Sequence, residues 1–142
     1  MSISARNVFK GQVSSVKAGA VNTEVEITIS GGDKIVAMLT DVSAKSLGLA
    51  VGKEAVAVIK APWVTLLAGT PEYRFSARNQ LSGIVGSVIQ GAVNSQVNIA
   101  LPGGAAVVAT VTNDAVSDMG LKDGMPVIAL FKAGHVIVGV PV

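Results

Sequence analysis

The sequence has no cysteine, which excludes disulfide bonds, thiolate catalysis and cysteine-ligated metals. Aromatic residues make up only 4% of its 142 residues, too few for the stacking surfaces with which proteins hold single-stranded nucleic acid. Neither sign of charge dominates, since 11 basic and 9 acidic residues give a formal net charge of +2 without any run of lysine or arginine. A protein that binds duplex DNA usually has a basic stripe, so the composition argues against a nucleic-acid partner.

Long apolar runs are also missing, although 50% of the residues are hydrophobic. No uncharged apolar segment approaches the roughly 18 residues that a membrane-spanning helix needs. The first ten residues, "MSISARNVFK", have no apolar core of the kind found in a signal peptide. We therefore expect neither a membrane segment nor an export signal, and the absence of cysteine suits a reducing cytoplasm.

The chain consists of two similar halves. When it is shifted by 72 positions, about 26 of the roughly 65 aligned residue pairs are identical, and no gap is needed. Two copies are too few for a solenoid, which needs at least about three. The repeat therefore predicts two like domains, at residues 1–70 and 71–142, joined by a linker at about residues 68–75.

Each half has the pattern of a small all-β domain. Residues 21–30 and 93–101 alternate between apolar and polar side chains, as half-buried strands do. A Gly-Gly pair follows each of these segments and predicts a hairpin turn. The further expected strands are residues 34–39, 55–60 and 64–67 in the first half, and residues 106–111, 127–132 and 136–140 in the second, with the last two strands of each half closing its own barrel.

A short helix is expected between the third and fourth strands of each half. Thr40 and Thr112 can act as N-caps, and Gly48 and Gly120 mark the ends. The chain order βββαββ is that of the oligonucleotide/oligosaccharide-binding (OB) fold. We predict two tandem OB-like five-stranded β-barrels with one short helix each, and another small all-β barrel remains the alternative.

The polar residues that both halves retain are almost all hydrogen-bond donors. They are Ser4/Ser76, Arg6/Arg78, Asn7/Asn79, Ser15/Ser87, Asn22/Asn94, Thr40/Thr112 and Lys60/Lys132, and no acidic residue has an acidic counterpart. A bare metal cation prefers anionic oxygen or imidazole ligands, and acid–base catalysis needs groups that titrate near neutrality. An oxyanion, by contrast, is bound most strongly by charged and neutral donors. The set therefore favours an anion site, although solvated strand ends and turn formers would also explain it.

The segment "GAVN" is retained in full, at residues 19–22 and 91–94. Asn22 is a poor strand former at the start of an alternating strand. Its retention fits either an anion-binding nest of backbone N–H groups or a plain Asx turn. The only histidine, His135, lies opposite Trp63 in the repeat, and without a "GxSxG" motif we expect it to be a packed or surface residue. Asn7 and Asn79 are interpreted as turn or strand-edge residues.

These motifs together resemble the molbindin (Mop) family of cytoplasmic molybdate-binding proteins, in its tandem form. The resemblance rests on "SARN", "GAVN[S/T]xV", "GG", a central threonine and a late Lys-Ala in each half. It implies OB-like modules around a threefold axis, with a two-module chain forming a homotrimer of six modules. Relatives often have serine where this chain has Ala61 and Ala133, so these two residues would offer only main-chain contacts.

The resemblance also implies two kinds of oxyanion site. The site between modules would use Ser4, Arg6, Thr40, Lys60, Ala61, Ser76, Arg78, Thr112, Lys132 and Ala133, and the site on the threefold axis would use Gly19, Ala20, Val21, Asn22, Gly91, Ala92, Val93 and Asn94. The implied ligand is molybdate or tungstate, held intact without a cofactor or a catalytic residue, for intracellular molybdenum storage and homeostasis. Two other functions remain open: an OB-type nucleic-acid binding module, or a protein-interaction module that responds to a ligand.

Overall fold

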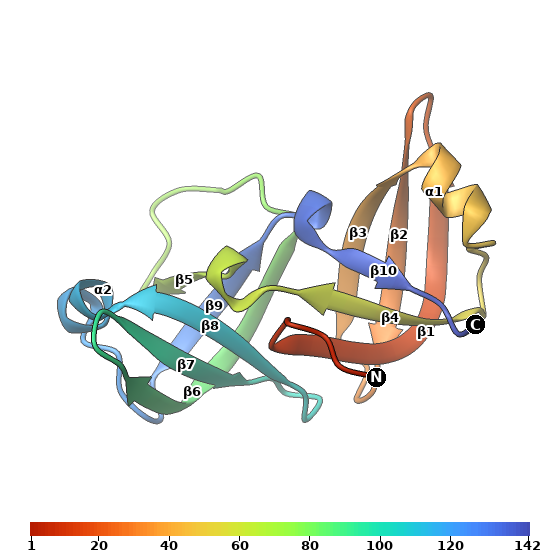
Figure 1. Ribbon diagram of the computed structural model, residues 1–142. Helices are drawn as coiled ribbons and strands as arrows, with labels where there is room; N and C mark the ends of the chain where they lie inside the picture. Colours follow the sequence, from red (N-terminus) through yellow and green to blue (C-terminus); the bar gives the residue numbers. More distant parts are fainter.

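The structure, a computed structural model, describes all of residues 1–142 and consists of two similar β units side by side (Figure 1). The first half of the chain forms β1 (Asn7–Ala18), β2 (Asn22–Ile29), β3 (Lys34–Thr40), α1 (Asp41–Ser46), β4 (Glu54–Ile59), η1 (Ala61–Trp63) and β5 (Thr65–Ala68). The second half forms β6 (Asn79–Gln90), β7 (Asn94–Ala100), β8 (Ala106–Thr112), α2 (Asn113–Met119), β9 (Pro126–Phe131), η2 (Ala133–His135) and β10 (Ile137–Gly139).

The expected order βββαββ is confirmed in both halves. Both helices begin where the threonines predicted, because the hydroxyl oxygen of Thr40 accepts the Ser43 N–H and that of Thr112 accepts the Ala115 N–H. The two 3-10 turns, η1 and η2, were not expected from the sequence. None of the helices has both the length and the apolar character that spanning a bilayer requires.

The last strand of each half pairs in the opposite unit. The expectation from the sequence, that it closes the barrel of its own half, is wrong. One sheet has the order β10-β4-β1-β2-β3 and the other β5-β9-β6-β7-β8, so β5 pairs with β9 and β10 pairs with β4. Figure 1 shows β10 beside β4, within the unit built mainly from the first half of the chain. The exchange follows from η1 and η2, which pack against β8 and β3 of the opposite half and so lead the chain across the junction.

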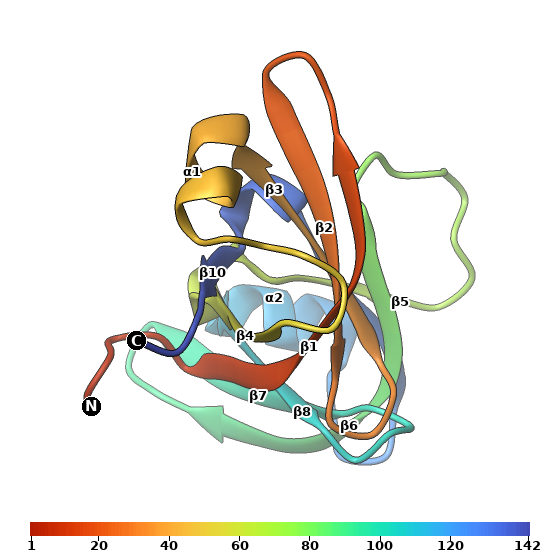
Figure 2. The ribbon, with the colours of Figure 1, turned by 90° about the vertical axis from the view of Figure 1, so that its right-hand side faces the viewer.

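Each sheet curls into a barrel-like unit, as the OB-like fold class predicts. In the second unit, for example, β5 pairs with β9 at one edge of the sheet and also lies close to β8 at the other. Residues 69–78, between β5 and β6, contain no helix or strand and loop out from the body of the molecule (Figures 1 and 2). The linker was expected at about residues 68–75, which begins one residue before this segment and ends three residues before it does.

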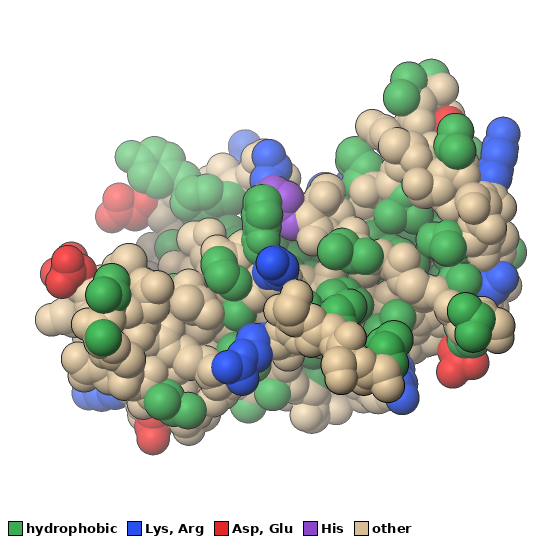
Figure 3. Space-filling model, viewed as in Figure 1, with side chains coloured by type: hydrophobic (Ala, Val, Ile, Leu, Met, Phe, Trp, Pro, Cys, Tyr) green, Lys and Arg blue, Asp and Glu red, His purple; other side chains and the backbone are tan.

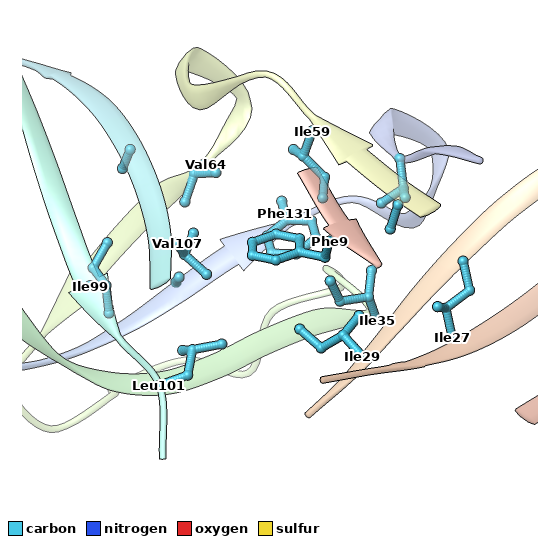
Figure 4. Close-up of a cluster of buried hydrophobic side chains, with 14 of the residues drawn as sticks. Phe9, Ile27, Ile29, Ile35, Ile59, Val64, Ile99, Leu101, Val107 and Phe131 are labelled. Carbon is cyan, nitrogen blue, oxygen red and sulfur yellow. The ribbon is translucent and has the colours of Figure 1, made fainter. Parts of the chain in front are cut away.

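The two units share one hydrophobic core. A single cluster of 24 buried residues runs through both of them. Phe9 of β1 and Phe131 of β9 lie next to each other in the middle of it, with Val107 on one side and Ile35 on the other (Figure 4). A domain of about 70 residues has a marginal core by itself, so joining two such cores into one stabilises both.

An approximate twofold axis relates the halves, and residues at equivalent positions meet on it. The rings of Trp63 and His135 have centroids 3.9 Å apart, and the two positions differ by the repeat length of 72. Gly31 and Gly103 are related in the same way, and a Cβ on either would overlap the carbonyl oxygen of the other. Side chains at this second contact would push the two hairpins apart, which explains why both halves keep glycine there.

Candidate functional site

Strand register brings the retained cations of each half together. In the β1–β4 pair, Asn7 lies opposite Ile59, so Arg6 and Lys60, the next residue on each strand, leave the sheet side by side. In the β6–β9 pair, Asn79 lies opposite Phe131, which places Arg78 beside Lys132 in the same way. Each half therefore presents one arginine and one lysine at its sheet end.

The asparagines that follow these arginines bind the opposite half. The Asn7 side chain donates from Nδ2 to the Val108 carbonyl oxygen at 2.8 Å and accepts the Val108 N–H at 2.7 Å. Asn79 makes the same pair of bonds with Val36, both at 2.8 Å. The sequence left the asparagines as turn or strand-edge residues. They begin β1 and β6 and are buried, and each carboxamide acts as one more backbone partner for a strand edge. These bonds hold the start of β1 against β8 and the start of β6 against β3, so the preceding arginines lie at the junction of the halves.

Arg78 already has an anionic partner. Its Nη1 donates to Glu24 Oε2 at 2.7 Å, across the junction between the halves. Glu24 was not among the candidates from the sequence, because Gln96 occupies the equivalent position and a comparison that keeps only shared residues discards the pair. The retained polar residues are all donors or hydroxyls, as the sequence indicated, but the structure places a carboxylate acceptor beside one of the two arginines.

The capping threonines lie near the cations of the opposite half. Thr40 is two positions beyond Met38 on β3, and Met38 is paired with Glu24, the partner of Arg78. Two residues along a strand span about 7 Å, and side chains at alternate positions share a face. Thr112 has the equivalent place beyond Thr110, which is paired with Gln96. The sequence grouped Thr40 with Arg6 and Lys60, whereas within one chain Thr40 lies closer to Arg78.

One hollow at the junction contains several of the candidate residues. It has a volume of about 320 Å³ and its walls include Ser76, Lys132, Trp63 and His135. Ala133 follows Lys132 and is buried, as Ala61 is after Lys60, so both alanines can act only through the main chain. The counterparts in the first half, Ser4, Arg6 and Lys60, are exposed. His135 was expected to be a packed or surface residue. Its ring contacts that of Trp63, and its Nδ1 is buried without a partner.

The "GAVN" segments form the exposed tips of the β1–β2 and β6–β7 hairpins. The Gly19 N–H donates to the Asn22 carbonyl at 2.8 Å, and the Gly91 N–H donates to that of Asn94 at 2.9 Å. Neither glycine has a positive φ, so the tips lack the pairing of a right-handed with a left-handed residue that forms a nest. The Asn22 side chain is exposed and makes no hydrogen bond, which also disfavours an Asx turn.

Each tip is fastened to the start of the following helix. The Val21 carbonyl accepts the Asp41 N–H at 3.0 Å, and Asp41 Oδ1 accepts the Thr23 hydroxyl at 2.5 Å. In the second half, Asn113 takes the place of Asp41 and bonds Ser95 at 2.6 Å. Val21 remains 72% exposed, so the tip presents apolar surface together with a free carboxamide.

The side chains and main-chain groups at the junction of the halves suit an anion better than a cation. No group of three or more His, Asp or Glu side chains is close enough together to hold a metal ion. On the face seen in Figure 3, basic side chains are scattered singly and form no continuous stripe. The chemistry available at the junction is therefore arginine, lysine, hydroxyl and main-chain donors, with Glu24 as the one carboxylate bonded to a candidate cation.

Comparison with known proteins gives consistent matches over the whole chain. The chain is 44% identical over 140 residues to the molybdenum transport protein ModE of Herbaspirillum seropedicae, covering 99% of this chain and 52% of the relative. It is 41% identical over 141 residues to the molybdenum-pterin-binding protein MopA of Rhodobacter capsulatus, covering 99% and 53%. The chain thus spans about half the length of the curated relatives it matches.

A solved structure matches over its full length. It is the cytoplasmic molybdate-binding protein ModG crystallised with molybdate bound, with a TM-score of 0.94 and 55% sequence identity, covering 99% of this chain and 100% of that one. The family model of the TOBE domain matches residues 3–66 and again residues 76–138, once in each repeat. The resemblance found in the sequence is therefore confirmed: the chain belongs to the TOBE-domain family, with two domains of the Mop type.

Proposed function

We propose that this chain binds molybdate, and tungstate, as intact oxyanions. The observation that carries the proposal is the gathering of retained donors at the junction of the halves: Arg78 beside Lys132, and Lys132 with Ser76 in one hollow. The names of the relatives support it, since ModG is described as molybdate-binding and was crystallised with molybdate. The proposed inter-module ligands are Ser4, Arg6, Thr40, Lys60, Ala61 and their counterparts Ser76, Arg78, Thr112, Lys132 and Ala133.

The chemistry of the donors fits a fully ionised dianion. Molybdate has no proton at neutral pH, so every oxygen can accept a hydrogen bond, whereas monohydrogen phosphate has a proton that must find an acceptor. Each charge-assisted bond contributes about 1.5–3 kcal/mol. Five or six of them exceed the association cost by enough for a dissociation constant of about 1 μM or lower. Sulfate has the same charge and shape but is smaller, so we expect its rejection to depend on the size of the site.

The "GAVN" tips are proposed as a second kind of site, in a homotrimer of six modules. Val21 and Val93 are 72% and 71% exposed, and burial of such tips against their copies would remove apolar surface from water. Around a threefold axis each copy would offer the same backbone N–H groups and the same asparagine carboxamide. A native mass of three chains tests this assembly, and a monomer at micromolar concentration contradicts it.

We propose that the protein acts by binding and release, without chemical conversion, in intracellular molybdenum storage and homeostasis in the cytoplasm. The donors at the junction require no cofactor for this role. We also propose that the chain itself contacts no nucleic acid, since its basic residues form no run. A salt-dependent mobility shift with single-stranded oligonucleotides would contradict this part and favour the nucleic-acid alternative.

Isothermal titration at physiological salt tests the ligand. Molybdate and tungstate should bind with similar affinity, because the two anions have the same charge and nearly the same size. Sulfate and phosphate at the same concentration should give no measurable heat and should not displace molybdate. Equal binding of sulfate, or no heat with molybdate, would overturn the proposed function.

A further inference from the structure

Glu24 makes the two arginine positions chemically unequal. Arg78 donates to the Glu24 carboxylate at 2.7 Å, and the other ion pair in the structure joins Lys34 to Glu26. Arg6 forms no ion pair. In the equivalent place the second half has Gln96, whose neutral amide cannot compete for a guanidinium as a carboxylate does.

Arg6 and Arg78 have equivalent backbone surroundings because of the approximate twofold symmetry. Asn79 binds Val36 of β3 and Asn7 binds Val108 of β8 with the same two hydrogen bonds, so the residues before them approach equivalent strands. Glu24 and Gln96 occupy equivalent registers on β2 and β7, opposite Met38 and Thr110. The difference between the two positions is therefore one of side-chain chemistry and not of fold.

We propose that Glu24 is an internal competitor for Arg78, which lowers the affinity of the Arg78 oxyanion site below that of the Arg6 site. The inference rests on the proposed function. An oxyanion entering the Arg78 site must displace the carboxylate from the guanidinium or share the guanidinium with it. At the Arg6 site no carboxylate has to be displaced. The Arg6 site therefore fills first, and one chain buffers its ligand over a wider concentration range than two equal sites would.

The size of the effect follows from the exposure of the pair. The Arg78 side chain is 54% exposed and that of Glu24 is 22% exposed, so the ion pair is a surface pair that solvent screens. Such pairs contribute up to about 1 kcal/mol, which corresponds to about fivefold in a dissociation constant. We expect the two sites to differ by about this factor, with the carboxylate weakening the Arg78 site without closing it.

Lys17 offsets the long-range electrostatic effect of Glu24 on Arg78, but it does not remove the direct hydrogen bond between them. It lies opposite Glu24 in the β1–β2 register, whereas Ile89 lies opposite Gln96. The extra lysine offsets the charge of Glu24 in the wider surroundings of Arg78. What remains different is the hydrogen bond itself, which occupies an Arg78 donor when no ligand is bound.

The test uses the two halves as controls for each other. Arg6→Gln leaves the Arg78 site as the one intact inter-module site, and Arg78→Gln leaves the Arg6 site, while the "GAVN" tips are the same in both backgrounds. Molybdate titrations are then made with and without Glu24→Gln in each background. Glutamine already occupies this position in the second half, so the variant should fold. We expect Glu24→Gln to tighten binding about fivefold in the Arg6→Gln chain and to change nothing in the Arg78→Gln chain.

Two further variants complete the test. Gln96→Glu should weaken the isolated Arg6 site by the same factor. Glu26→Gln removes the same charge two residues away on β2 and should leave both sites within twofold. If Glu24→Gln has no effect on the isolated Arg78 site, or acts no more strongly there than Glu26→Gln, the inference is wrong. If the wild-type chain does not bind molybdate at all, the proposed function itself fails.

Discussion

The Asn7 carboxamide is hydrogen-bonded to both backbone groups of Val108, a residue 101 positions away in the opposite half of the chain. The related pair of Asn79 and Val36 repeats the arrangement. Asn7 and Asn79 are equivalent at the repeat spacing of 72, and so are Val36 and Val108, so both halves keep both members of the contact. The two contacts join the units and at the same time fix the position of the arginine that precedes each asparagine.

Asn7→Ala should destabilise the whole protein and not only one unit. The substitution leaves the Val108 N–H and carbonyl without partners at a junction that is largely closed to water, which costs about 2–4 kcal/mol. Denaturant unfolding measures the loss, and both units should unfold in one transition because they share a core. Gln12→Ala is the control, since the Gln12 side chain is exposed and lies outside the proposed sites, and its effect should stay within about 0.5 kcal/mol. A loss below 1 kcal/mol for Asn7→Ala would contradict this role.

Removal of β10 should expose the backbone of β4 in the first unit to exchange and leave the second unit protected. A chain that ends at residue 136 lacks one of the two partners of β4, because β10 pairs with β4 through Ile137, Val138 and Gly139 and β1 pairs with its other edge. Hydrogen exchange followed by mass spectrometry should show faster exchange in β4, with β9 still protected by β5 and β6. Removal of residues 141–142 alone serves as the control. Faster exchange in β9 instead would mean that the last strand pairs within its own half.

Trp63 should report ligand binding at the junction. It is the only tryptophan, and it lies in the same hollow as Ser76 and Lys132, with its ring against the tilted ring of His135. Molybdate bound to Lys132 would change the polarity beside the indole ring, so its fluorescence should shift or be quenched in a saturable way. Lys132→Ala should abolish the response while leaving the contact between the Trp63 and His135 rings intact. A response that persists in this variant would place the ligand elsewhere.

Much of the fold follows from local sequence patterns. Alternating hydrophobicity located the strands, and the capping threonines located α1 and α2, because both signals depend on neighbouring residues. The exchange of β5 and β10 could not be predicted in this way. Each of these strands faces two similar sheet edges, β4 and β9, and the choice is made by the short turns η1 and η2, which pack across the junction.

The candidate site was predictable in part for a related reason. Arg6, Lys60 and their counterparts stood out because both halves keep them, and strand register then places each arginine beside its lysine. The partner of Asn7 could not be found, since Val108 offers only backbone groups that any residue has. Glu24 was missed because it differs between the halves, and a difference between copies is the signal that would have pointed to it.

Retention of molybdenum in the presence of sulfate tests the central claim most directly. The protein is dialysed to equilibrium against about 1 μM molybdate with millimolar sulfate, and bound molybdenum is counted per chain by mass spectrometry. We predict at least one molybdate per chain for the wild type. Lys60→Ala with Lys132→Ala should weaken binding about 10- to 100-fold, the contribution of one charge-assisted bond at each site. Lys45→Ala with Lys122→Ala, which removes one unretained lysine from each half, should bind as the wild type does. No retained molybdenum, or equal loss in the two double variants, would contradict the account.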